Sequence, residues 1–140
     1  MTPEPPLAES PSCHPVQARN PDIAHLVETF YAAARQDALL GPVFAAAIAD
    51  WPHHLAALTA FWAAQLRGRG AYRGQPIAAH RALAARASPA LTPPMFARWL
   101  ELWGVTCRAC MAPADADALI ERAARIAAAL QGAIWPGEPA

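Results

Sequence analysis

Apolar side chains recur every three or four residues in several separate stretches of the chain, which is the spacing of a helix buried along one side. After a first stretch that starts at Asn20, four more cover residues 51–66, 76–88, 93–106 and 113–130, and a short apolar piece covers residues 43–49. The pattern predicts about five helices and no strands. The apolar positions of the first stretch are Ile23, Leu26, Val27, Phe30 and Ala34.

Prolines and short polar side chains mark where these helices begin and end. Gly41-Pro42 interrupts the first helical pattern, and the glycine-rich segment 68–75 is typical of an exposed loop. Ser88-Pro89 predicts the end of the helix that begins at Pro76. Three further helix starts combine a capping residue with a proline suited to the first turn: Asn20 with Pro21, Asp50 with Pro52, and Thr92 with Pro93.

Composition supports a single all-α domain. Of the 77 apolar residues in this 140-residue chain, 37 are alanine, so the larger side chains can fill only a small core between closely packed helices. Six of the 15 prolines lie in the first 21 residues among Glu, Ser and Thr, where little apolar surface is available for burial. We predict a disordered tail over residues 1–19, one domain over residues 20–135 and a disordered C-terminus over residues 136–140.

Charge and cysteine content narrow the classes of partner. The formal net charge is zero and all 11 basic residues are arginine, so no cationic excess favours nucleic acid or an anionic membrane surface. The longest charge-free apolar run, Leu39 to Ala49, is about half the length of a bilayer span. Three cysteines and no recognisable signal segment predict a cytoplasmic protein.

Most familiar catalytic motifs are missing from the sequence. No Glu is followed by His three residues later, as a di-iron bundle requires, and there is no phosphate loop or zincin motif. Cys107 and Cys110 form a C-x-x-C pair, but no βαβ pattern surrounds them and no His follows. We interpret these two cysteines as small apolar groups on a helix.

His80 is the candidate for chemistry that the residues themselves favour. It falls on an apolar helix face between Ile77 and Leu83, while His54 and Tyr31 occupy apolar faces of other predicted helices. A core histidine bonded to a backbone carbonyl is the alternative for His80 alone. A buried planar cofactor, best matched by haem with one axial imidazole, accounts for these groups together with a surplus of flat side chains: Phe44, Phe61, Trp62, Trp99 and Trp103.

Four segments, taken in order, resemble the characteristic segments of the group III truncated haemoglobins. They are FYAAARQDALLGPVF, IADWPHHLAALTAFW, AYRGQPIAAHRAL and LTPPMFARWLELW, and the resemblance extends over roughly residues 20–130. It implies a two-over-two helical globin around one haem b. The chain departs from the family pattern in an ARASPA-like insertion within residues 84–91, in Pro94-Met95 after Thr92-Pro93, and in Trp103.

The resemblance also implies roles for individual residues. His80 matches the proximal iron ligand and Phe44 the phenylalanine that packs on the haem. Tyr31, His54 and Trp99 match the distal residues, which would act on the ligand, and Trp51 and Leu55 favour His54 over His53 in this frame. Other expected haem contacts are Leu58 and Phe61, which share a helix face with His54, together with Tyr72, Arg73 and Arg81, of which Arg73 or Arg81 would pair with the propionates.

Two functions of different classes remain open at this point. The first is a haem protein that binds O2, NO, CO or peroxide and uses them in redox chemistry, NO dioxygenase-like or peroxidase-like, or in sensing, rather than in bulk oxygen transport. Such chemistry implies an electron-donating reductase as a partner. The second is a haem-free helical interaction module whose aromatic side chains only form a core. The colour of the purified protein separates the two.

Overall fold

The computed structural model describes residues 20–67, 76–86 and 90–136, which form six helices and contain no strand. The sixth helix arises because the short apolar piece after Gly41 is itself helical. Among the described residues no helix is both long and apolar enough to cross a bilayer. The helices are α1 (Asn20–Ala34), α2 (Gly41–Ala47), α3 (Trp51–Arg67), α4 (Pro76–Arg86), α5 (Pro93–Cys110) and α6 (Pro113–Ile134).

The predicted helix starts are correct to within a residue, but their capping differs. Asp50 caps α3 as expected, because its carboxylate accepts the backbone N–H of His53 at 3.1 Å. Thr92 precedes α5 in an extended conformation, yet its side chain makes no capping hydrogen bond, so that part of the prediction is wrong. Pro93 fixes the first turn there instead. α4 ends at Arg86, and the predicted end at Ser88-Pro89 lies outside the described residues.

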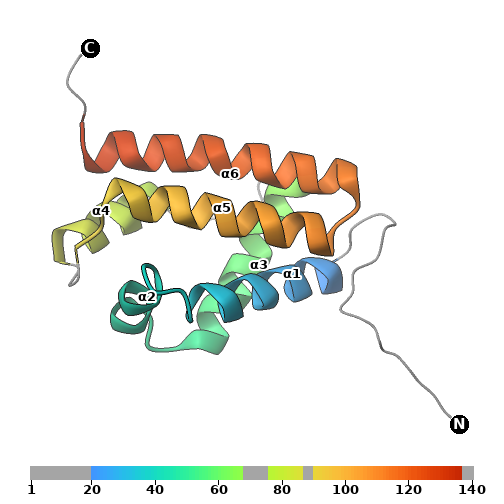
Figure 1. Cartoon of the computed structure of the whole chain (residues 1–140), viewed down its shortest axis with the longest axis horizontal. Coiled ribbons are helices and arrows are strands. Elements are labelled where there is room, and N and C mark those ends of the chain that lie inside the picture. Colours follow the sequence, from blue (N-terminus) through green and yellow to red (C-terminus); the bar gives the residue numbers. More distant parts are fainter. Residues whose placement is uncertain (1–19, 68–75, 87–89, 137–140) are drawn as a thin grey trace, which may run out of the picture.

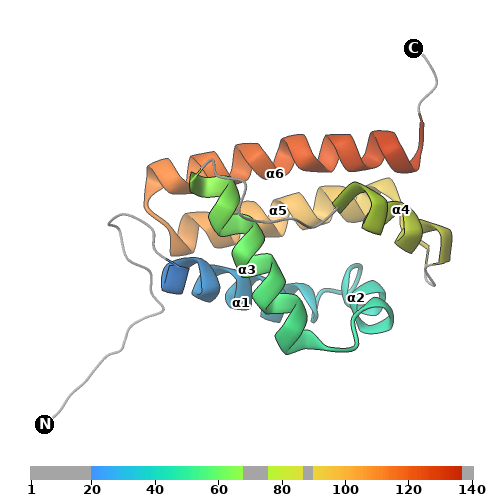
Figure 2. The same ribbon diagram turned by 180° about the vertical axis from the view of Figure 1, so that it is seen from behind.

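Four long helices pack as one pair over another. α1 contacts α3, and α5 lies beside α6 along most of its length, as Figures 1 and 2 show from opposite sides. The pairs meet where α1 contacts α5 and where α3 contacts α6. α4 packs on α6. α2 follows α1 and lies at the same end of the molecule as α4 (Figure 1). The expected two-over-two arrangement is confirmed.

Closely packed aromatic rings fill the centre of this arrangement. The Trp103 side chain is fully buried, and its indole N–H donates to the Leu119 carbonyl at 3.3 Å. Its ring centroid lies 4.5 Å from that of Trp62, 5.1 Å from that of Phe30 and 5.2 Å from that of Trp99. These rings come from α1, α3 and α5, so they hold together the helices that surround the site described below.

The two cysteines of the C-x-x-C pair belong to the same core. Cys107 and Cys110 are both buried near the end of α5 and are not joined by a disulfide. Burial raises the pKa of the Cys107 thiol to about 12. A thiol in this state is neutral at physiological pH, which agrees with the interpretation of the pair as small apolar groups.

The turn between α1 and α2 depends on glycine at position 41. The Gly41 N–H donates to the Asp37 carbonyl at 2.8 Å. A Cβ atom at this position would lie 2.6 Å from the backbone oxygen of Arg35, which is closer than real Cβ contacts allow. Because the obstructing atom belongs to the backbone, a side chain at position 41 would require the turn itself to move.

Gly41→Ala is therefore expected to lower the free energy of unfolding by about 1–3 kcal/mol, the usual cost of overpacking. Gly104→Ala is the matched control, because nothing lies within 4 Å of its added Cβ and the residue is inside α5. That control should gain about 0.5–1 kcal/mol from helix propensity. Urea unfolding of both variants checks the prediction, and equal stabilities would contradict it.

Candidate functional site

A cavity of about 380 Å³ lies between the helices at the end of the molecule that carries α2 and α4. Every helix contributes to its wall, and most of the lining side chains are apolar. The size lies within the range of small-molecule and cofactor sites. Its polar lining groups are few and come from different helices: Tyr31 from α1, His54 from α3, His80 and Arg86 from α4, and Trp99 from α5.

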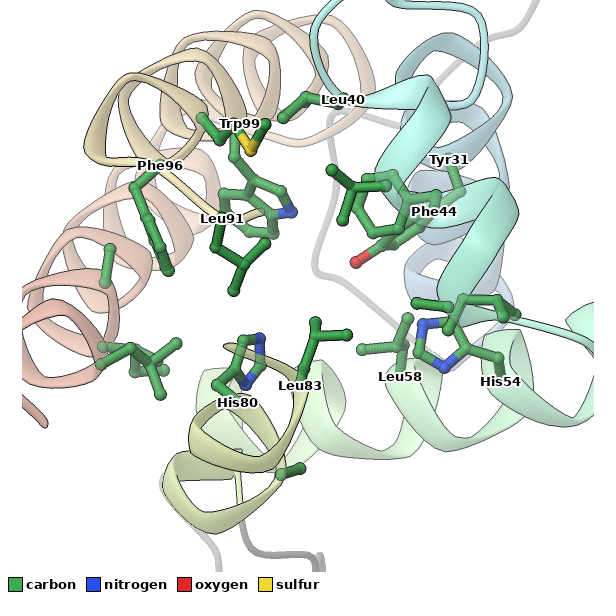
Figure 3. Close-up of a pocket in the computed structure, with 18 of the residues that line it drawn as sticks. Tyr31, Leu40, Phe44, His54, Leu58, His80, Leu83, Leu91, Phe96 and Trp99 are labelled. Carbon is green, nitrogen blue, oxygen red and sulfur yellow. The ribbon is translucent and has the colours of Figure 1, made fainter. Parts of the chain in front are cut away.

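Tyr31 places a phenol at the cavity, as Figure 3 shows. The residue is only 4% exposed, and burial raises its pKa well above the ordinary value for tyrosine. A hydrogen bond with Trp99 opposes part of this shift. Because an indole N–H can only donate, Trp99 donates to the Tyr31 oxygen. Tyr31 therefore keeps its own proton and can donate it to a group in the cavity.

His54 lies beside Tyr31, with ring centroids 5.9 Å apart in an edge-to-face arrangement. Burial lowers its pKa, and the positive charges of His53 and His80 lower it further. His54 is therefore neutral at pH 7, with one N–H donor and one acceptor nitrogen. His53 is exposed and does not line the cavity, whereas His54 does.

His80 reaches the cavity from α4, on the side away from Tyr31 and Trp99 (Figure 3). Its imidazole is half-buried and directed toward the space between the helices. His80 and His54 both line this cavity, from α4 and α3. The structure thus brings together an imidazole on one side of an apolar space and a phenol with an indole donor on the other.

The other expected site residues divide into three groups. Phe44, Leu58 and Phe61 all line the cavity. Arg81 is exposed and is not among the lining residues, whereas Arg86, which the sequence analysis did not single out, is. Tyr72 and Arg73 lie outside the described residues. The cavity also has apolar lining residues that the sequence pattern did not assign to the site: Met95, Phe96, Ile126 and Leu130.

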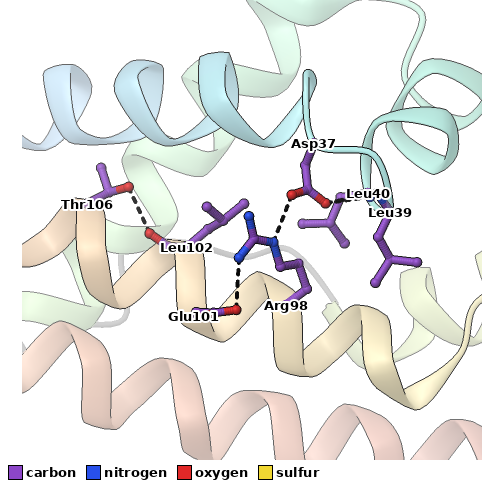
Figure 4. A network of polar contacts seen from close by, with 7 residues as sticks. All are labelled: Asp37, Leu39, Leu40, Arg98, Glu101, Leu102 and Thr106. Atoms are coloured by element: carbon purple, nitrogen blue, oxygen red, sulfur yellow. Dashed lines mark hydrogen bonds and ion pairs between the residues drawn. The ribbon is translucent and has the colours of Figure 1, made fainter.

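An ion pair fixes the position of α2 and thus of Phe44. The Asp37 carboxylate accepts a hydrogen bond from Arg98 Nε at 2.8 Å, and its other oxygen accepts the backbone N–H groups of Leu39 and Leu40, each at 3.0 Å (Figure 4). The bond from Arg98 is the main reason that the pKa of Asp37 is lowered. Since Arg98 precedes Trp99 on α5, this pair connects two walls of the cavity.

Comparisons with known proteins place this geometry in context. The sequence matches no protein-family model. It is 33% identical over 117 residues to the group 3 truncated hemoglobin ctb of Campylobacter jejuni subsp. jejuni serotype O:2, a match that covers 81% of this chain and 88% of the relative. The fold is similar to the crystal structure of a group III truncated hemoglobin from Campylobacter jejuni, with a TM-score of 0.76 and 32% identity over 88% of this chain and 97% of that one.

Proposed function

The chain belongs to the group III truncated haemoglobins, and from this premise we propose that it holds one haem b through His80 and binds diatomic ligands beside Tyr31. The observation that carries the proposal is the pair of opposed walls: an imidazole directed into an apolar cavity from α4, and a protonated phenol directed into it from α1. When bound, haem supplies an iron atom with one position for the imidazole and one for a ligand.

The cavity suits a flat apolar group with carboxylates at its edge. Phe44, Leu58 and Phe61 line it with apolar surface from α2 and α3. Arg86 is an exposed arginine on the cavity wall and can pair with a propionate carboxylate. It is the candidate that the structure favours over Arg81 for this contact.

The distal residues act as a short relay of hydrogen bonds. Trp99 donates to the Tyr31 oxygen, which orients the phenol and leaves its proton directed elsewhere. A donor in a dry, low-dielectric cavity binds a negatively charged acceptor more strongly than water does. Tyr31 therefore favours ligands that acquire partial negative charge on binding, O2 above all, and slows their release.

Slow release favours reaction over delivery. A protein that holds O2 tightly is a poor carrier, so we assign redox chemistry on O2, NO or peroxide, or sensing of these ligands, in place of bulk transport. Turnover of that kind requires an electron-donating reductase as a partner. His54 is neutral and half-buried at the cavity wall, so it can donate to the ligand or move aside to admit one.

The test is titration of the purified haem-free protein with haemin. We expect saturation at one haemin per chain and a Soret band that sharpens on reduction and shifts on addition of CO. His80→Ala under the same conditions controls for haemin that binds without the imidazole on α4. A folded, colourless protein whose spectrum and thermal midpoint ignore haemin would instead support the haem-free interaction module.

A further inference from the structure

Trp51 contacts three residues that line the cavity, each from a different helix. Its ring centroid is 5.6 Å from that of His54, 5.9 Å from that of Tyr31 and 6.1 Å from that of Phe44. Trp51 is half-buried, and it is not among the residues that line the cavity. It therefore cannot contact a bound ligand directly, yet it supports side chains from three helices that can.

Arg35 in turn covers Trp51. Its guanidinium carbon lies 4.2 Å from the centre of the Trp51 ring, which is a close cation–π contact. The Arg35 backbone is itself fixed, because its N–H donates to the Tyr31 carbonyl at 2.9 Å. The exposed arginine at the end of α1 is thus connected, through one tryptophan, to the histidine on α3.

We propose that Trp51 is a positioning residue that keeps His54 at the cavity, and that Arg35 controls access of ligands by holding Trp51 in place. The effect on access rests on the proposed haem function, whereas the effect on His54 itself does not. Arg35 therefore acts from outside the cavity, and its guanidinium does not contact the ligand.

The geometry of a helix explains why Trp51 can restrain His54. Side chains on a helix lean toward its N-terminus, over the turn that precedes them. Trp51 is three residues before His54 in α3, so it occupies the turn over which the imidazole leans. Their rings meet nearly perpendicularly, at 88°, so the indole restricts movement of the imidazole on this side.

The strength of the Arg35 contact sets the expected size of the effect. An exposed cation–π contact changes an equilibrium by about two- to fivefold. Loss of Arg35 should raise the population of His54 outside the cavity by this factor. Loss of the Trp51 ring should raise it further, because both the support and the cover of the imidazole disappear.

The first experiment uses the haem-free protein and follows the His54 imidazole by NMR as the pH is varied. Burial lowers the pKa of His54, and the charges that act on it come from His53 and His80, which the variants leave in place. Trp51→Leu and Arg35→Ala should both raise this pKa toward its ordinary value, and Arg35→Lys should restore part of the shift. Arg108→Ala is the matched control, an exposed arginine on α5 that pairs with Asp117.

The second experiment measures CO rebinding after flash photolysis of the haem-loaded protein. Arg35→Ala should raise the association rate about two- to fivefold with little change in CO dissociation. In a His54→Leu background the same change should have no effect, because the imidazole that restricts access is already absent. If Arg35→Ala acts equally in both backgrounds, or if the pKa of His54 and the association rate stay unchanged in Arg35→Ala, the proposal is wrong. Arg35→Ala alone decides the matter if Trp51→Leu fails to fold.

Discussion

His80→Ala should lose tightly bound haem. No other imidazole lies on the α4 side of the cavity among the described residues. Loss of the axial ligand should weaken haem binding by more than about a hundredfold. Substitution of residues that only support a metal ligand already lowers metal affinity by about 10–100-fold. Transfer of haem to apomyoglobin, followed by absorbance, measures the loss, and added imidazole should reverse part of it.

His25→Ala provides the control for this substitution. His25 is an exposed histidine on α1, and it is not among the residues that line the cavity. This variant should bind haem as the unaltered protein does. Normal haem affinity and an unchanged ferrous spectrum in His80→Ala would exclude His80 as the iron ligand.

Tyr31→Phe should speed dissociation of O2 by about ten- to a hundredfold. A hydrogen bond to a charged acceptor contributes about 1.5–3 kcal/mol, and each 1.4 kcal/mol corresponds to a factor of ten. CO is a weaker acceptor, so its dissociation should change much less. Stopped-flow displacement of O2 by CO measures the first rate, and displacement of CO by NO measures the second.

Trp99→Phe tests whether the relay passes through Tyr31. Because Trp99 donates to the Tyr31 oxygen, its loss should also speed O2 dissociation, whereas adding it to Tyr31→Phe should change the rate little. His54→Leu should mainly change the association rate. If both single donor variants released O2 within a factor of two of the unaltered protein, the argument for redox function over transport would lose its physical basis.

Local sequence patterns were sufficient for most of the fold. Apolar periodicity located the long helices, and Asp50 identified the start of α3. The short helix α2 was read only as an apolar piece, because Gly41-Pro42 was interpreted as an interruption although Pro42 also suits a first helical turn. Contacts between distant segments were out of reach: Asp37 and Arg98 are 61 residues apart, and their meeting depends on how α1 crosses α5.

The candidate site was predictable where a residue's own helix face decided its place. The resemblance and the apolar faces together identified Tyr31, His54 and Trp99, but the bond between Trp99 and Tyr31 requires the packing of two helices. Arg86 shows what the pattern still contained. At 100° per residue, Ala79, Leu83 and Arg86 lie on one side of His80, and Arg81 lies on the other.

Labelling of the buried thiols of α5 can measure how often the core opens. Thiolate is the species that reacts with alkylating reagents, and burial keeps Cys107 protonated and covered beside the Trp103 cluster. Its modification in the native protein must therefore wait for an opening of this part of the molecule. With the third cysteine of the chain, Cys13, changed to Ser, the rate of labelling then measures how often the helices around Cys107 separate, and a cofactor that binds only the closed state slows that rate.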